Sequence, residues 1–599
     1  MVELIWTGKY DERGKVVAPV RVSLPFQTIE TVNESAQQRQ MAWDLLSMDR
    51  PADWRNRLIW GDKKYVLPAL LDEFAEEVSL IYIDPPFFTG DDFSFNISVD
   101  GEDFTKEPSL IEQKAYRDTW GSGLDSYLAW FHSTVIQLRE LLTPTGSIFV
   151  HLDWHVGHYA KLVLDEVFGT ENFRNEIVWH YYNKLQGNIN RFASNHDVIF
   201  WYSKSANFHF ARLREQRETP KRQQKRVWDG ASKSLKQARD EDGKLIYYTE
   251  TERTIDDVWR LPYLMPADKT ENLGYPTQKP ELLLERIILA STEPGDLVLD
   301  CFAGSGTTAA VAEQQGRRWI TSDLGRFAIN TTRKRLLSNQ SVQPFVVQNL
   351  GKYERQLWQA AEFGDSAGEI TATYRNFILD LYHAEHFKAS AWLHGVKQGR
   401  MVHVGTVDAP VTVSDVRQIV ADFAKIAASG SNGPSKKAID VLGWDFAFEL
   451  NEVARQDAQA AGIDLRLVRI PREVLERRAV EQGDIAFFEL AALDIQHVVS
   501  GLDLDLAIRN FIIPLDDVPA EVQEAVSHWS QWIDYWAVDW ENHDDTFHNE
   551  WQTYRTRNSK TLDLETLHHY SEPGEYRVVI KVIDILGNDT TKVLNVKVG

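Results

Sequence analysis

The chain has 599 residues, of which 43% are hydrophobic and 26% charged, and its formal net charge is −23. This length predicts roughly three or four domains, and no apolar run reaches the ~18 residues that cross a bilayer. Its one cysteine, Cys301, excludes an internal disulfide and a zinc cluster built on cysteines, and we expect no metal site. The first residues show no secretory signal pattern, so we expect a cytoplasmic protein without membrane contact.

Two expected elements open the chain. Residues 24–50, which include NESAQQRQMAWDLL, are expected to form a helix to which we assign no chemistry. The run VSLIYID at 78–84 is short, apolar and partly β-branched, as buried parallel strands are, and DPPF at 84–87 ends it. Taken alone, DPPF would be a strand stopped by proline, with an aromatic residue in the core.

Further strand-like and helix-like segments alternate along the chain. The expected strands are at 146–152, 296–302 and 318–323, and the expected helices are at 124–142 and 306–315. This alternation predicts an α/β fold with a doubly wound, mostly parallel sheet.

A basic island interrupts the acidic chain. From 204 to 239 there are eleven Lys and Arg against three acids, whereas 350 to 599 holds 24 against 39. A run of charge is equally consistent with a solvated helical face. A local island in an acidic chain nevertheless favours one contact with a polyanion over a surface that binds polyanions everywhere.

A glycine-containing loop follows the strand that ends at Asp300. Gly304 and Gly306 lie in it and a helix of small residues begins at about Thr307, which lets backbone approach a ligand closely. The loop has no Lys before Ser or Thr, which disfavours triphosphate hydrolysis. A dinucleotide fingerprint would have Ala309 at its third glycine position, which is a tolerated variant. Asp323 ends the next strand, 23 residues after Asp300. The two acids suit the amino acid and ribose of a ligand without phosphates, such as S-adenosylmethionine.

Together the motifs resemble those of the amino-group DNA methyltransferases, which modify adenine N6 or cytosine N4. The resemblance covers about residues 55–340 and rests first on DPPF and on DCFAGSGTT at 300–308. The catalytic motif precedes the cofactor loop, as in the permuted β-type enzymes, and the chain is similar to type III modification subunits. Other matching segments are RLIWGD at 57–62, residues 144–169 and 172–181, and YPTQKPELLLERII at 275–288.

The spacing of four carboxylates agrees with this resemblance. Asp62 precedes Asp84 by 22 residues and Asp300 precedes Asp323 by 23, about one strand–helix–strand unit each, so four acids end four neighbouring strands and face one crevice. The resemblance implies that Asp300 lies near the methionine part of S-adenosylmethionine, Asp323 on the ribose and Asp62 near the adenine amino group. Asp323 departs from the family, which often has Glu there. The expected cofactor-binding residues are Asp62, Thr277, Lys279, Asp300, Phe302, Gly304, Gly306, Thr307 and Asp323.

DPPF then has a catalytic role. An exocyclic amino group is a poor nucleophile because its lone pair is delocalised into the ring. Asp84 and the Pro85 carbonyl can accept its two hydrogens and turn the lone pair toward the methyl donor, and proline suits this position because its φ is fixed and it offers only an acceptor. Pro86 completes the motif, and Phe87 is placed to stack on a target base flipped out of the duplex.

The residues weigh against rival chemistries. Methylation of cytosine C5 needs a thiolate, and Cys301 lies within the cofactor loop. N4-cytosine enzymes usually have Ser in place of Asp84, and enzymes acting on protein glutamine or RNA typically have Asn there. We therefore expect a site-specific adenine-N6 DNA methyltransferase. The alternatives are an N4-cytosine enzyme and a non-catalytic DNA-binding subunit of an anti-phage complex.

Residues 183–270 stand where the family places target recognition, and they include the basic island. We expect most of its cations to contact phosphates and one or two to read bases. The expected DNA-binding residues are Arg212, Arg214, Arg217, Lys221, Arg222, Lys225 and Arg226. The expected substrate is double-stranded DNA with a flipped base, and a second copy of the chain is a possible partner. A restriction system would supply a separate nuclease subunit, because the chain shows no helicase or nuclease motif; a solitary regulatory methylase is equally consistent with the sequence.

Two further domains are expected after the catalytic one. Within them, 438–470 has the pattern strand, helix, strand. Asp440, Asp445 and Glu449 would suit a nuclease, but no Glu-x-Lys follows them, so a scaffold is favoured. The expected boundaries are 1–54 for an N-terminal extension, 55–345 for the catalytic domain, 346–500 for an α/β accessory domain and 501–599 for a β domain similar to PKD and immunoglobulin-like modules.

Overall fold

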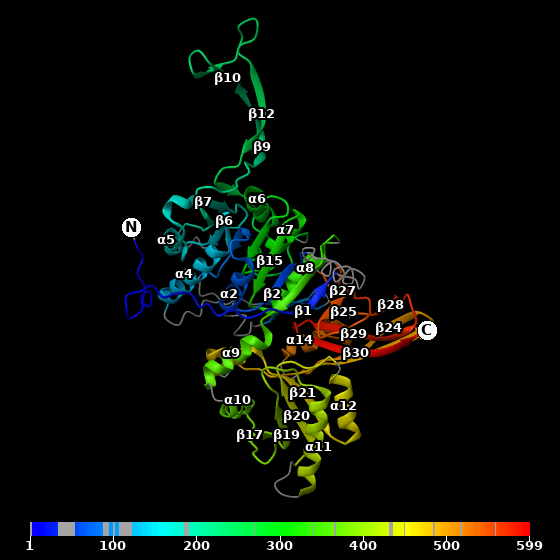
Figure 1. Ribbon diagram of the computed structural model, residues 1–599. Helices are drawn as coiled ribbons and strands as arrows, with labels where there is room; N and C mark the ends of the chain where they lie inside the picture. The colour runs from blue at the N-terminus through cyan, green and yellow to red at the C-terminus, as the bar shows by residue number, and fades with distance from the viewer. Residues whose placement is uncertain are drawn as a thin grey trace, which may run out of the picture.

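The computed structural model shows a large α/β domain from which a thin arm rises, with a smaller α/β domain below it and a β domain to one side (Figure 1). Among the helices that it describes, none is long and apolar enough to cross a membrane. The described residues are 3–33, 54–87, 95–99, 102–106, 123–184, 190, 192–268, 270–339, 341–364, 367–429, 435–448, 450–482, 485–515, 518–556 and 559–599.

An 11-stranded sheet forms the large domain. Its four central strands are parallel to one another. Moving outward from them toward one edge of the sheet, the first strand that runs in the opposite direction is the third strand from that edge. In spatial order the strands are β13 (Val258–Arg260), β7 (Phe173–His180), β8 (His196–Ser203), β6 (Leu142–Leu152), β3 (Val78–Ile83), β14 (Leu297–Asp300), β15 (Arg318–Asp323), β2 (Asn56–Trp60), β16 (Phe345–Asn349), β1 (Gln27–Val32) and β26 (Phe547–Asn549).

Helices cover both faces of this sheet. The central strands serve both cores, because successive side chains point to opposite faces: in β3, Ile81 and Ile83 belong to one core, and Leu80 and Tyr82 to the other. The doubly wound α/β fold predicted from the alternating segments is confirmed. The helices on the first face are α2 (Lys63–Phe74), α4 (Leu124–Leu141) and α5 (Gly157–Phe168), and those on the second are α6 (Glu281–Ser291), α7 (Thr307–Gln314) and α8 (Arg326–Leu337).

The helix expected at 24–50 is wrong where the structure describes this stretch. Its residues 27–32 form β1, which pairs antiparallel with β16 and parallel with β26 from the far end of the chain. The sequence QTIETV carries β-branched side chains, which fit a pleated sheet better than a helix. The sheet of the large domain therefore continues into the C-terminal part of the chain. Residues 34–53 lie outside the described residues.

A two-stranded arm leaves the large domain between β8 and β13. Its shaft is the antiparallel pair β9 (Arg214–Gln224) and β12 (Tyr247–Thr254), and its tip is the pair β10 (Arg226–Asp229) and β11 (Ser234–Gln237). Figure 1 shows the arm standing clear of the rest of the molecule. The basic island thus forms a β-hairpin, not the helical face that its charge also allowed.

A six-stranded sheet forms the smaller α/β domain. Asp440 is buried and paired with Arg400, and Asp445 is paired with Arg355, which agrees with a scaffold; Glu449 lies outside the described residues. The strand, helix and strand predicted at 438–470 are present as β20, α12 and β21. The elements of this domain are α9 (Gly351–Phe363), α10 (Ala367–Leu381), β17 (Glu385–His386), β18 (Gly395–Lys397), β19 (Arg400–Val404), α11 (Val413–Ser429), β20 (Ala438–Gly443), α12 (Leu450–Ala460), β21 (Asp464–Arg469) and β22 (Phe488–Glu489).

Two antiparallel sheets form the β domain, and Trp532, Trp536 and Trp540 are buried in its core. Its first strand begins at Ala492, ahead of the boundary expected at 501. One sheet contains β23 (Ala492–Ser500), β24 (Asp503–Ile512) and β28 (Glu565–His569), and the other contains β27 (Trp551–Tyr554), β25 (Ile533–Asp539), β29 (Gly574–Asp584) and β30 (Asp589–Val598).

Candidate active site

Four aspartates lie at or just beyond the carboxyl ends of four neighbouring strands. In the order β3, β14, β15, β2 they are Asp84, Asp300, Asp323 and Asp62. Parallel strands present these ends at one edge of the sheet, and there the four side chains line one cavity of about 420 Å³. The segment 84–87 and the glycine loop therefore share a cavity, as the spacing of the acids predicts.

Most residues of the predicted motifs line this cavity, but Gly306 does not. Gly306 precedes α7 with a φ of 73°, and a Cβ atom there would lie 2.6 Å from Cγ2 of Thr332 in α8. Glycine is therefore needed for the close packing of the loop against α8. The predicted residues that line the cavity are Asp62, Asp84, Pro85, Pro86, Phe87, Thr277, Lys279, Asp300, Phe302, Gly304, Thr307 and Asp323.

Asp300 and Asp323 hold the glycine loop in place. Asp323 accepts hydrogen bonds from the backbone amides of Gly304 at 2.9 Å and Gly325 at 2.8 Å, and Asp300 accepts one from the Thr308 hydroxyl at 2.6 Å. Burial raises the pKa of Asp300 to about 7 and that of Asp323 to about 6. A cationic ligand in the cavity would stabilise the charged form of both. A ribose hydroxyl that contacts Asp323 would donate to the carboxylate lone pairs that the two backbone amides do not use.

Asp84 is held by Lys279. Nζ of Lys279 donates to Oδ2 of Asp84, and the two side chains form a largely buried ion pair. Oδ1 of Asp84 is also buried, but no described residue donates a hydrogen bond to it. Burial by itself would lower the pKa of Lys279, but the Asp84 carboxylate raises it above its ordinary value, so Lys279 is a cation. One carboxylate oxygen is thus fixed, and the other is available to a ligand.

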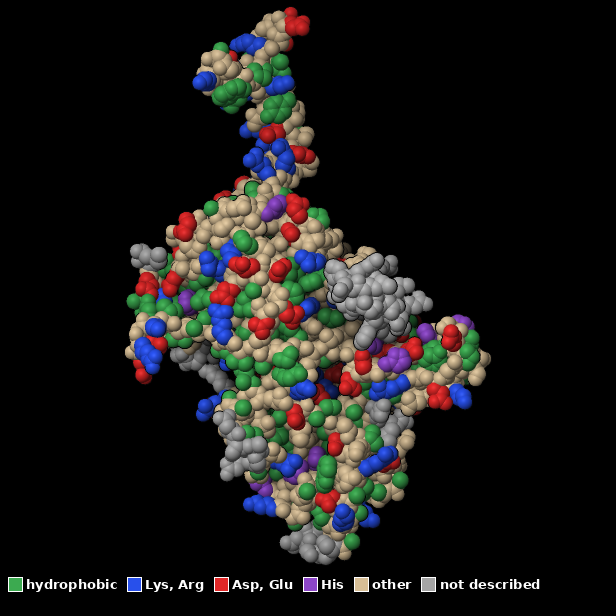
Figure 2. Space-filling model, viewed as in Figure 1, with side chains coloured by type: hydrophobic (Ala, Val, Ile, Leu, Met, Phe, Trp, Pro, Cys, Tyr) green, Lys and Arg blue, Asp and Glu red, His purple; other side chains and the backbone are tan. Residues whose placement is uncertain are grey.

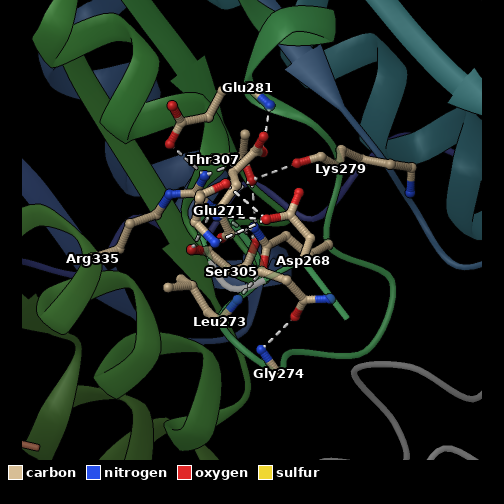
Figure 3. A network of polar contacts seen from close by, with 12 residues as sticks. Asp268, Glu271, Leu273, Gly274, Lys279, Glu281, Ser305, Thr307 and Arg335 are labelled. Carbon is tan, nitrogen blue, oxygen red and sulfur yellow. Dashed lines mark hydrogen bonds and ion pairs between the residues drawn. The ribbon is translucent and has the colours of Figure 1, made fainter. Parts of the chain in front are cut away.

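The segment that carries Lys279 is tied to the glycine loop. The Thr307 hydroxyl donates to the Lys279 carbonyl at 3.2 Å and accepts from Arg335 of α8 at 2.8 Å. Arg335 also pairs with Glu281 at 2.7 Å, and Thr277 adopts a φ of 64°, which is uncommon for a residue other than glycine. Figure 3 shows this network, with the Lys279 side chain pointing away from it. One polar network therefore positions both the glycine loop and the partner of Asp84.

Several residues that line the cavity belong to no motif, and the sequence analysis missed them. The Lys63 ammonium lies 4.1 Å from the centre of the Trp130 ring and 5.2 Å from that of Phe302. Lys63 directly follows Asp62, and this position in the sequence could have marked it as a residue of the site. Trp130 belongs to α4, whose sequence indicates only a helix, so its place beside the loop comes from packing. Other lining residues of this kind are Ser133, Thr134 and Gln137.

A buried polar cluster lies behind Phe87. The Tyr82 hydroxyl and His151 Nδ1 are 2.9 Å apart, and His151 Nε2 and Asp197 Oδ2 are 3.3 Å apart. Burial would raise the pKa of Asp197, but His151 lowers it below its ordinary value. The His151 and Phe87 ring centres are 5.9 Å apart. The cluster therefore joins β3, β6 and β8 beside the aromatic ring expected to stack on a target base.

The predicted DNA-binding residues lie on or beside the arm, and none of them lines the cavity. Two of them are already paired: Arg214 with Glu252 at 3.1 Å and Arg217 with Glu250 at 2.6 Å. The structure thus separates the basic island from the aspartates and divides it into paired and unpaired cations.

A doubly wound sheet with a ligand cavity across the carboxyl ends of its central strands defines the nucleotide-binding class of α/β enzymes. Within that class, residues 78–334 match the N6/N4 methyltransferase family, described as DNA methylase. The type II methyltransferase M.EcaI of Enterobacter cloacae is 30% identical over 380 residues, which make up 53% of this chain and 80% of that protein. The chain therefore belongs to the N6/N4 family of DNA methylases.

Two other matches are similar in extent. The type II methyltransferase M2.DpnII of Streptococcus pneumoniae is 28% identical over 270 residues, which make up 44% of this chain and 83% of that protein. Among solved structures, the cytosine-N4-specific PvuII DNA methyltransferase is 20% identical with a TM-score of 0.30, over 47% of this chain and 87% of that one. The family model lies within the large domain, and each of these two matches covers less than half of this chain.

Proposed function

We propose that this DNA methyltransferase transfers a methyl group from S-adenosylmethionine, its methyl donor, to the N6 amino group of adenine in double-stranded DNA. One observation carries the proposal: Oδ1 of Asp84 is buried, accepts no hydrogen bond from a described residue and lies in the same cavity as the glycine loop. An acceptor in this state suits a donor N–H group supplied by a substrate.

The donor set of the cavity fits S-adenosylmethionine. This ligand carries an ammonium and a sulfonium group, and it would favour the ionised forms of Asp300 and Asp323, which burial otherwise disfavours. We assign Asp300 to its methionine part, Asp323 to its ribose and Asp62 to its adenine. When bound, the ligand supplies a methyl group on a cationic sulfur. Lys279 is paired with Asp84, so we assign it the role of positioning Asp84 and not the cofactor contact that the motif implied.

Asp84 and Pro85 prepare the amino group. Oδ1 of Asp84 accepts one N–H hydrogen and the Pro85 carbonyl accepts the other, so the nitrogen becomes tetrahedral and its lone pair faces the methyl group. Phe87 stacks on the flipped ring and fixes its plane. Methylation leaves a positive charge on the nitrogen, and Asp84, which accepts one of its hydrogens, is placed to take the proton that restores neutrality. Lys279 keeps Asp84 oriented through this step.

The base is tested directly. The protein is incubated with radiolabelled S-adenosylmethionine and DNA of mixed sequence, and the DNA is then digested to nucleosides. We expect the label in N6-methyladenine, because Asp84 and Phe87 favour adenine. Label in N4-methylcytosine would overturn the choice of base, and no label in DNA would favour a non-catalytic DNA-binding subunit.

We further propose the setting of this activity. The protein acts in the cytoplasm as part of a restriction-modification system, with the nuclease supplied by a separate subunit and with the chain as a homodimer. Its likeness to type III modification subunits and the PKD-like character of its β domain are parts of the same proposal. Sedimentation velocity tests the homodimer: a single species at the mass of one chain would overturn it.

A further inference from the structure

The arm consists of two parts that differ in charge pairing. We call residues 211–217 and 250–257 the lower arm, and residues 218–249 the upper arm. In the lower arm, Arg214 and Arg217 of β9 are paired with glutamates of β12. Glu215 forms an ion pair with Arg286 of α6 at 2.7 Å. The pair with Arg286 fixes the base of the arm to the large domain, and the other two pairs neutralise Arg214 and Arg217.

The upper arm carries cations without acidic partners. From Lys221 to Arg239 there are seven Lys and Arg but one acid, Asp229, which is paired with Lys236. Three acids follow in the turn at 240–242. Figure 2 shows Lys and Arg along the shaft and at the tip, with acidic side chains at the outer end. The exposed cations of the upper arm that form no ion pair with a described side chain are Lys221, Arg222, Lys225, Arg226, Lys233 and Arg239.

The tip adds an exposed apolar pair. Trp228 stands opposite Leu235 across β10 and β11, and they are 65% and 60% exposed. Side chains two apart on a strand share a face, so Trp228 and Arg226 point the same way. Apolar surface left in water forgoes about 25 cal/mol for each Å² that a partner would cover. The tip therefore has the composition of a contact surface, with a cation beside an aromatic ring.

The arm does not point toward the cavity. Before it, the chain follows the amino ends of the strands: the Ser205 hydroxyl donates to the Pro144 carbonyl at 2.8 Å, and the Ala211 amide donates to the Ala290 carbonyl, near the end of α6, at 2.8 Å. Figure 1 shows the arm on the opposite side of the large domain from α9, which follows the carboxyl end of β16. A duplex whose target base enters the cavity therefore does not meet the upper arm at the target site.

We propose that the upper arm is a second DNA-contacting surface, which binds duplex DNA away from the target base. The inference rests on the proposed function, which makes duplex DNA the polyanion that this protein handles. Unpaired cations on an acidic chain complement phosphates, and a two-stranded ribbon fits the major groove, which is about 12 Å wide. The seven residues of β9 that belong to the upper arm extend over roughly 23 Å, about two thirds of a turn of B-DNA.

Removal of charge from the upper arm tests this surface. In Lys221→Gln/Lys225→Gln/Arg226→Gln, three unpaired cations are lost. Binding to a duplex of several helical turns is measured by fluorescence anisotropy as salt is varied. The logarithm of the affinity falls as the logarithm of the salt concentration rises, and each lost phosphate contact makes this slope less steep by about 0.9. Between about 50 and 200 mM salt the wild-type affinity should therefore fall about 40-fold more than that of the variant.

A matched control removes the same charge elsewhere. Lys388, Lys425 and Lys597 are exposed, lie in the other two domains and make no ion pair with a described side chain. Their triple change to Gln should keep the wild-type slope. A wild-type slope in the arm variant, or an equal loss of slope in the control, would overturn the second DNA-contacting surface.

Activity on short DNA separates this inference from the proposed function. On a duplex of about one helical turn, centred on a site that the wild type methylates, the arm variant should reach the wild-type rate at saturating DNA, because this duplex cannot also reach the arm. Normal methylation with an unchanged salt slope would overturn the arm inference alone. Failure of the wild type to methylate any DNA would overturn the proposed function.

Trp228→Thr tests for a protein partner at the tip. If the tip contacts DNA, this variant should bind the long duplex several-fold more weakly, because it loses the apolar contact surface of an aromatic ring. Its sedimentation should equal that of the wild type. A wild-type dimer that becomes a monomer in Trp228→Thr, with DNA affinity unchanged, would assign the tip to a second copy of the chain and overturn the proposal.

Discussion

Lys279 and Asp84 stand 195 positions apart in the chain and form an ion pair at the cavity wall. A buried carboxylate without a partner would be costly, so Lys279 stabilises the Asp84 side chain and fixes one of its oxygens. The other oxygen is buried and open to a substrate. Because the Lys279 carbonyl accepts a hydrogen bond from Thr307, the same residue connects Asp84 to the glycine loop.

Asp84→Ala should abolish methyl transfer and leave cofactor affinity nearly unchanged. The variant loses the acceptor for the amino group, and loss of a positioned acid–base group lowers the rate by about 10²–10⁴-fold. Single-turnover kinetics measures the transfer step, and isothermal titration calorimetry measures S-adenosylmethionine binding. Loss of cofactor binding in this variant would show that Asp84 has a different role.

Lys279→Met should lower kcat at least about tenfold and destabilise the protein. Removal of one partner from a buried ion pair lowers the free energy of unfolding by about 3 kcal/mol, because the other charge stays buried. Lys279→Arg keeps the charge and should recover part of both losses. The pair of variants is compared by urea unfolding, kcat and the cofactor dissociation constant. A weakened cofactor affinity with kcat unchanged would return Lys279 to the cofactor site.

Gly306→Ala should weaken cofactor binding, and Gly316→Ala should not. Both glycines have positive φ, 73° and 69°, so both substitutions strain the backbone by about 1 kcal/mol. The added Cβ meets Thr332 at 2.6 Å in the first variant and nothing within 4 Å in the second. If the contact with Thr332 adds about 1.4 kcal/mol of strain to the cofactor-bound state, the affinity for S-adenosylmethionine falls tenfold. Thr332→Ala should recover part of the affinity in Gly306→Ala, and equal effects of the two glycine variants would contradict the clash.

The ligand-free protein should lose stability as pH rises through neutrality. Burial raises the pKa of Asp300 to about 7 and that of Asp323 to about 6, so above the ordinary Asp range the folded state holds more protons than the unfolded state. The free energy of unfolding therefore falls as pH increases from about 5 to 8. Asp300→Asn should show a smaller decrease in Tm over this range.

S-adenosylmethionine should offset this loss, because its positive charge favours the ionised carboxylates. The increase in Tm that saturating ligand causes is measured at about pH 5 and pH 8, and it should be larger at pH 8. Equal increases at the two pH values would mean that Asp300 and Asp323 do not respond to the charge of the ligand.

Glu30 should be essential to the connection between the two ends of the chain. It is fully buried in β1 and pairs with Arg333 at 2.9 Å and with Lys581 of β29 at 2.7 Å. Lys581→Met should lower the free energy of unfolding by about 3 kcal/mol, since it leaves a buried network short of one charge. Lys597→Met, at an exposed position of β30, is the control and should change it by about 0.5 kcal/mol or less. Equal effects in guanidinium unfolding would contradict a structural role for the buried network.

Much of the candidate site follows from local sequence. Buried parallel strands are short apolar runs, and the four central ones have Asp84, Asp300, Asp323 and Asp62 at their last residue or within two residues beyond it. A parallel sheet puts such ends at one edge, so the signals of strand, acid and spacing were enough to predict a shared cavity. Trp130 gave no signal of this kind, because a helix that packs beside a ligand has the same amphipathic pattern as a helix that packs beside the core.

The sequence by itself therefore determined the order of the elements, the doubly wound sheet and the set of acids at its edge, because these depend on neighbours along the chain. Tertiary structure alone decided that Lys279 holds Asp84 and that Glu30 lies between Arg333 and Lys581. It also decided that Glu250 neutralises Arg217, while no acidic side chain that the structure describes pairs with Lys225. These pairs join residues between 33 and 551 positions apart. They depend on strand register and on which faces pack, and a shift of one residue in a strand would turn each side chain to the opposite face.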